Sequence, residues 1–167
     1  MSQTPAVGDL APSFDLPSDG GGRARLADFR GRPLVLFIYP QDDTETCTAE
    51  AIAFNGLRRD FEKAGAALVG LSPDAPAAHD RFKKKYRLAL TLASDESKAT
   101  LQAYGAWGEK SLFGRRYMGV LRTTFLIDAA GRVARTWEKV RVRGHAEDVL
   151  AATALLRAAG QAAKYAK

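Results

Sequence analysis

The chain has 167 residues, of which 46% are hydrophobic, and it carries a formal net charge of +6 with a single cysteine. This size supports an ordinary core, so a disulfide-stapled miniprotein is excluded, and one cysteine cannot form an internal disulfide. We find neither a secretory signal nor a run of about 18 apolar residues that could span a bilayer. We therefore expect one cytoplasmic domain over residues 1–167, without membrane association.

The positive charge does not form a stripe with interleaved aromatic residues, which is the pattern typical of nucleic-acid binding. Its densest cluster, Lys83, Lys84, Lys85 and Arg87, falls at the end of a predicted helix, where the helix dipole favours cations. We interpret this cluster as a solvated helix end. An anion-binding patch is the less favoured alternative, and no nucleic-acid partner is expected.

The first half of the chain predicts a strand, helix, strand unit. "DGGGR" at 19–23 indicates a turn between two short strands. The apolar runs "LVLFIY" at 34–39, which Pro40 closes, and "ALVGLS" at 67–72 predict buried strands. Between them, apolar residues recur at spacings of three and four and predict a helix from 46 to 64. A parallel pairing with a right-handed crossover is the expected geometry.

The second half predicts more helices and one pair of strands. Segments 72–86 and 94–107 each indicate a loop followed by a helix, the second with Ser94 or Asp95 as its amino-terminal cap. The runs "TTFLID" and "VARTW", within 123–137, indicate two strands joined by a short glycine-containing turn.

A last helix is predicted in 144–160, with Gly160 as its carboxyl-terminal cap. The whole pattern predicts an α/β fold with a mixed central sheet that helices cover on both faces.

Cys47 lies in the first turn of the helix that follows Pro40, where unpaired amide groups favour thiolate over thiol. Glu50, three residues on, shares a helix face with Cys47. Two neighbouring anions are unfavourable without a cation between them, so the sequence predicts an arginine or lysine arriving from elsewhere. Thr44 adds a hydroxyl three residues before the thiol, and Pro40, which lacks an N–H, ends the strand rigidly.

Pro40, Thr44 and Cys47 match the P-x-x-x-T-x-x-C signature of the peroxiredoxins, and "FIYPQDDTETCTAEA" at 37–51 resembles the bacterioferritin comigratory protein or peroxiredoxin Q subfamily. The resemblance covers nearly the whole chain. It implies a thioredoxin-like (peroxiredoxin) fold with an amino-terminal β-hairpin in 7–21, a later core in 104–131 and a last strand and helix in 139–150.

The same resemblance implies a thiol-dependent peroxidase for hydrogen peroxide and alkyl hydroperoxides, with no cofactor and no metal. In the family an arginine just before the "FLID" strand reaches the reactive thiolate, and here that residue is Arg122. Many relatives carry a second cysteine where this sequence has Ile52 or near Lys83. Its absence implies reduction by an external thiol, namely thioredoxin, glutaredoxin or a low-molecular-weight thiol. The subfamily also suggests a monomer or weak dimer.

A lowered thiol pKa cannot by itself make a peroxidase. Lowering a thiol pKa from 8.5 to about 6 raises the thiolate fraction about thirtyfold but reduces nucleophilicity about eighteenfold. Transition-state donors must supply the rest. We assign Cys47 as nucleophile, and as donors Arg122, Thr44 and the first amide groups of the helix. Pro40 shields the sulfur and Glu50 orients Arg122.

Alternative interpretations of these residues, without peroxidase chemistry, remain open. A lone cysteine is more often a small buried hydrophobe than a nucleophile. A disulfide oxidoreductase normally uses C-x-x-C, and Glu50 occupies the second cysteine's place. A thioredoxin-fold binding or holdase protein could keep the thiol only as a redox sensor. The two histidines, His79 and His145, are isolated in the sequence and predict neither a metal site nor a catalytic triad.

Overall fold

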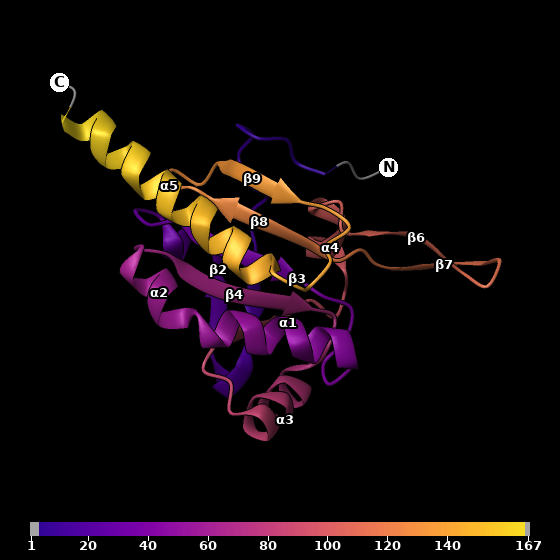
Figure 1. The fold of residues 1–167 in the computed structure, drawn as a ribbon. Helices are drawn as coiled ribbons and strands as arrows, with labels where there is room; N and C mark the ends of the chain where they lie inside the picture. The colour runs from indigo at the N-terminus through magenta and orange to yellow at the C-terminus, as the bar shows by residue number, and fades with distance from the viewer. Residues whose placement is uncertain (1–3, 166–167) are drawn as a thin grey trace.

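The computed structural model describes residues 4–165 and is built around a five-stranded sheet with the order β5-β4-β3-β8-β9 (Figure 1). The first three strands of the sheet run parallel, and β8 and β9 are antiparallel to their neighbours, so the sheet is mixed. The five strands are β3 (Leu34–Ile38), β4 (Ala67–Ser72), β5 (Thr91–Ser94), β8 (Thr123–Ile127) and β9 (Val133–Trp137).

The central strand β3 is buried along its whole length because both faces of the sheet are covered. Leu34, Leu36 and Ile38 face one core, and Val35 and Phe37 face the other. The second core receives α1, α2, α3 and α5, and the first receives α4 and the amino-terminal segments. The helices are α1 (Glu45–Gly56), α2 (Arg58–Lys63), α3 (Pro76–Tyr86), α4 (Ala99–Ala103) and α5 (His145–Tyr165).

Two antiparallel hairpins flank this sheet. The first pairs β1 (Asp15–Pro17) with β2 (Arg23–Arg25), and short 3₁₀ turns, η1 (Asp19–Gly21) and η2 (Leu26–Phe29), lie within and after it. The second pairs β6 (Trp107–Leu112) with β7 (Arg115–Val120) and projects away from the body (Figure 1). Within the described residues, no helix is both long and apolar enough to cross a bilayer.

Several predicted elements are confirmed. The two apolar runs are β3 and β4, and they pair in parallel. The segments around residues 123–137 form the antiparallel pair β8 and β9, and "DGGGR" joins the two strands of the amino-terminal hairpin. The α/β class with a mixed sheet flanked by helices is therefore correct.

Other predictions about helices are wrong. The single helix expected over 46–64 is broken between α1 and α2 at Leu57. The backbone amide of Leu57 donates a hydrogen bond to the Phe54 carbonyl, three residues back. Gly56 allows this break because glycine weakens helix interiors. Gly160 does not end the last helix, since α5 continues through it to Tyr165.

Ser94 does not cap α4, because it is the last residue of β5. The sequence analysis did not predict this strand. The cap position of α4 is Lys98, although the Asp95 carboxylate accepts the Leu101 amide at 2.7 Å and so satisfies one first-turn donor. The hairpin β6–β7 was also missed. The strand expected within 139–150 is absent, since the residues before α5 form loop and turn.

Candidate active site

The position of Cys47 follows from the strand–helix junction. Strand β3 ends at Ile38, residues 40–44 form a turn, and α1 begins at Glu45. Cys47 is therefore in the first turn of α1, where amide groups lack intrahelical acceptors and point toward an anion. Only 2% of the residue is exposed. Burial of this degree is what an inert cysteine would also show, so the neighbours of the sulfur decide its character.

Arg122 reaches the sulfur because of the sheet topology. Strand β8 runs antiparallel to β3 with Thr123 opposite Ile38, so the residue before β8 lies at the end of the sheet where α1 begins. The guanidinium of Arg122 donates from Nη2 to Cys47 Sγ at 3.2 Å. A charge-assisted donor aimed at a sulfur stabilises it as an anion.

Glu50 completes a three-residue cluster. Arg122 donates from Nη1 to Glu50 Oε1 at 2.7 Å, so one guanidinium joins the carboxylate and the sulfur. The structure thus brings together Cys47, Glu50 and Arg122, and the helical spacing of the two acidic groups explains how both reach one cation. The second carboxylate oxygen, Oε2, is buried and has no hydrogen-bond partner among the described residues.

The charges of the cluster are set by burial and by each other. Burial raises the pKa of Glu50 to about 7, against the opposing effect of the Arg122 charge. For Arg122, burial lowers the pKa, but the interactions with Glu50 and Cys47 outweigh it and the net direction is upward. The guanidinium therefore stays charged, while the carboxyl group changes its protonation near neutral pH.

Thr44 and Pro40 are placed nearby but not on the sulfur. The Thr44 hydroxyl is exposed and donates to the Gln41 carbonyl at 3.1 Å. It must rotate before it can donate to a bound peroxide. Pro40 follows β3 and opens the turn that leads into α1. Its ring fixes the backbone there, and no described contact joins it to Cys47.

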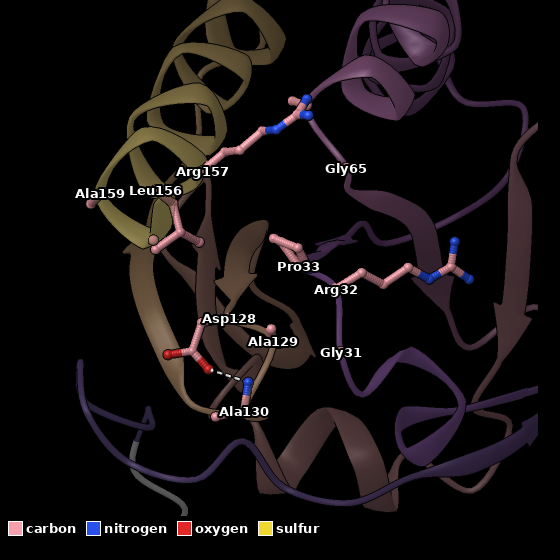
Figure 2. Close-up of a pocket in the computed structure, with 12 residues that line it drawn as sticks. Gly31, Arg32, Pro33, Gly65, Asp128, Ala129, Ala130, Leu156, Arg157 and Ala159 are labelled. Carbon is pink, nitrogen blue, oxygen red and sulfur yellow. Dashed lines mark hydrogen bonds between the residues drawn. The ribbon is translucent and has the colours of Figure 1, made fainter. Parts of the chain in front are cut away.

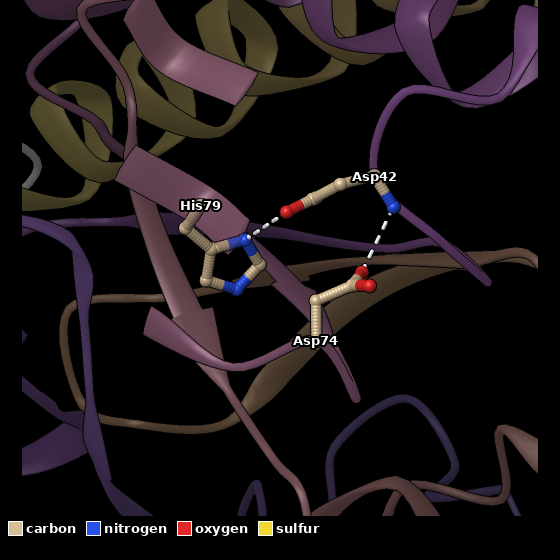
Figure 3. Close-up of side chains that lie close together, drawn as sticks. All are labelled: Asp42, Asp74 and His79. Carbon is tan, nitrogen blue, oxygen red and sulfur yellow. Dashed lines mark hydrogen bonds and ion pairs between the residues drawn. The ribbon is translucent and has the colours of Figure 1, made fainter. Parts of the chain in front are cut away.

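The sequence analysis missed a second polar cluster beside this turn. His79, expected to be isolated, has 0% side-chain exposure and lies 2.7 Å from Asp42, with Asp74 beside them (Figure 3). One signal was available: His79 and Phe82 share the buried face of α3, and a buried histidine must find partners for both ring nitrogens.

The hollow in Figure 2, about 640 Å³ in volume, lies elsewhere. Its lining includes Pro33, which precedes β3, and Leu156 and Arg157 of α5. Pro33 and Cys47 lie beyond opposite ends of β3, and the residues that line the hollow include no cysteine. The candidate active site is therefore the cluster at Cys47 and not this hollow.

Comparisons with known proteins identify the family of the chain. The AhpC/TSA family matches residues 7–136. The chain belongs to the peroxiredoxin family. Peroxiredoxin Bcp of Xanthomonas campestris is 42% identical over 152 residues, covering 89% of this chain and 95% of the relative. Peroxiredoxin Bcp of Bacillus subtilis is 38% identical over 144 residues, covering 86% and 92%.

A solved structure supports the fold. It comes from a study of the alkyl peroxide reduction activity of Xanthomonas campestris bacterioferritin comigratory protein. Its TM-score is 0.82 at 38% identity, with 86% of this chain and 92% of that chain covered. The expected thioredoxin-like peroxiredoxin fold and the subfamily resemblance are confirmed. Peroxiredoxins are thiol-dependent peroxidases, and this one has a single cysteine.

Proposed function

We propose that this peroxiredoxin reduces hydrogen peroxide and alkyl hydroperoxides through a sulfenic acid on Cys47, which an external thiol then reduces. The observation that carries the proposal is the guanidinium of Arg122 at 3.2 Å from the only sulfhydryl of the chain. The alkyl peroxide activity named for the Xanthomonas campestris relative supports the substrate class.

The first half-reaction transfers one oxygen atom. The Cys47 thiolate attacks one peroxide oxygen, an S–O bond forms and the O–O bond breaks. Sulfur is oxidised by two electrons, and the leaving hydroxide or alkoxide takes a proton and departs as water or alcohol. Negative charge moves onto the peroxide oxygens during this step. Arg122 and the first amide groups of α1 are the preorganised donors that stabilise it.

The second half-reaction needs a partner because the chain has no second cysteine. One external thiol attacks the sulfenic sulfur, releases water and leaves a mixed disulfide. A second thiol displaces Cys47 as thiol and departs as a disulfide. Thioredoxin, glutaredoxin and low-molecular-weight thiols can each supply this chemistry. We further propose a monomer or weak dimer, which sedimentation velocity at several concentrations measures directly.

A peroxide-consumption assay with dithiothreitol tests the proposal. We expect the wild type to consume many equivalents of hydrogen peroxide and Cys47→Ser to consume none above background. Intact mass spectrometry after one equivalent of peroxide should show one added oxygen that thiol removes. A protein that reacts once and stops despite dithiothreitol would be a redox sensor instead, and the peroxidase proposal would fail.

A further inference from the structure

The turn that precedes α1 is anchored by a buried polar network. Asp42, in the middle of the turn, accepts the Tyr39 hydroxyl on Oδ1 at 2.7 Å, and its Oδ2 lies 2.7 Å from His79 Nδ1. The Asp42 amide donates to Asp74 Oδ2 at 2.8 Å (Figure 3). The turn is thereby fixed to β3, to α3 and to the loop after β4.

Both ring nitrogens of His79 face oxygen atoms. Nδ1 meets the Asp42 carboxylate, and Nε2 lies 3.0 Å from the Ala93 carbonyl. A backbone carbonyl only accepts, so Nε2 must carry a proton. Asp42 already accepts from the Tyr39 hydroxyl, which favours its ionised form and places the other proton on Nδ1. The ring is then an imidazolium paired with a buried carboxylate.

We propose that His79, as this buried imidazolium, is a positioning residue for the peroxidase reaction, acting through Asp42 on the turn that sets the start of α1 and Cys47. The inference rests on the proposed function. It needs no contact between His79 and the peroxide. Its physical basis is that a reacting atom misplaced by about 1 Å can cost about 100-fold in rate.

A metal ion is the competing occupant of this cluster. One ligand atom each from Asp42, Asp74 and His79 lies within 4.8 Å of the others. However, Asp74 Oδ2 already accepts from the Ser72 hydroxyl at 2.6 Å as well as from the Asp42 amide, and His79 Nδ1 is committed to Asp42. These hydrogen bonds already occupy the ligand atoms, which favours a proton between His79 and Asp42 over a metal ion.

The proposal gives the turn a defined dependence on pH. The groups that face His79 are Asp42, Asp74 from the loop after β4 and the Ala93 carbonyl of β5, while Tyr39, which follows β3, acts through Asp42. Burial lowers the pKa of His79, but the interactions with Asp42, Ala93 and Asp74 outweigh it and raise it. The locked turn is therefore present below the ordinary histidine pKa of about 6.5 and weakens as pH rises through this raised pKa.

Nitrogen-15 NMR of the two histidines tests the protonation state directly. At pH 6 we expect His79 to show two protonated ring nitrogens. His145 serves as an internal control, because burial lowers its pKa to about 4 and its ring should be neutral. A neutral His79 ring at pH 6 overturns the proposal. This spectrum requires no peroxidase activity, so it is read even if the proposed function fails.

Kinetics of sulfenic acid formation test the positioning role. We expect His79→Gln and Asp42→Asn each to slow oxidation by hydrogen peroxide by about 10-fold to 100-fold. We also expect the wild-type oxidation rate to decline at alkaline pH and this decline to be absent in both variants. The double variant should be less impaired than the product of the two effects, because each single change strands a buried partner.

Tyr86→Phe is the matched control for the kinetics. It removes an exposed hydrogen bond of 2.6 Å to Asp43, the neighbour of Asp42 in the same turn, and should change the rate less than about twofold. Wild-type rates and pH profiles in both folded single variants would overturn the proposal. If either single variant fails to fold, the pH profile of the double variant is measured instead. An oxidation rate that still declines at alkaline pH in the double variant would also overturn the proposal.

Discussion

The proposed mechanism depends most on Arg122. Arg122→Ala removes the donor at 3.2 Å from Cys47 Sγ and also removes the only partner described for Glu50. One preorganised donor to a developing oxyanion is worth about 3 kcal/mol, which corresponds to a loss of about 100-fold to 1000-fold in rate. Stopped-flow measurement of oxidation by hydrogen peroxide under pseudo-first-order conditions gives this rate directly.

Two further variants separate local from general effects. Arg116→Ala makes the same change in net charge at a side chain that is 81% exposed, so its rate should match the wild type. Arg122→Lys keeps the charge but loses the two-pronged geometry, and we expect an intermediate rate. If Arg122→Ala oxidised within about threefold of the wild type, donor stabilisation by Arg122 would be refuted.

Three predictions concern stability. Because the pKa of Glu50 is raised, its contribution to the free energy of unfolding is present below its unfolded pKa and is lost as pH rises through about 7. The free energy of unfolding should therefore fall by about 3 kcal/mol between pH 4.5 and 8, as measured by urea unfolding. Glu50→Gln should abolish this fall. The effect of His145 has the opposite sign, because its pKa is lowered to about 4. The free energy of unfolding should fall by about 3 kcal/mol as pH falls from 6.5 to 4, and His145→Gln should reduce this fall. Arg87 ends α3 with φ 54°, so Arg87→Gly should raise the unfolding free energy at pH 7 by about 1 kcal/mol, and a lower value would contradict the strain.

The sequence was most informative where one face or one motif decides the structure. The runs that became β3 and β4 are continuous and apolar because both faces of the sheet are covered, which is visible in the residues alone. The helix position of Cys47 and its spacing to Glu50 are local features, so a requirement for a cation could be stated in advance. Its identification as Arg122 needed a resemblance to a family.

The remaining errors came from long-range partners. His79 and Asp42 are 37 residues apart and meet only after α3 packs beside the turn, so neither residue type reveals the pair. Strand β5 is short, and its burial depends on pairing with β4, which a local pattern does not encode. The hairpin β6–β7 has mostly exposed residues and therefore lacks a clear alternation of apolar and polar positions.

The free energy needed to bury the charged groups around Cys47 explains how a buried cysteine can be reactive. Removing Arg122 and Glu50 from water costs several kcal/mol for each ion, and a well-packed apolar cluster is often as stable or more stable. Stability therefore gives no reason to bury a guanidinium against a sulfur. A buried hydrophobic cysteine would also need no charged donor within 3.2 Å. The arrangement is explained if the sulfur carries negative charge during the reaction, because a desolvated cation then interacts with it most strongly.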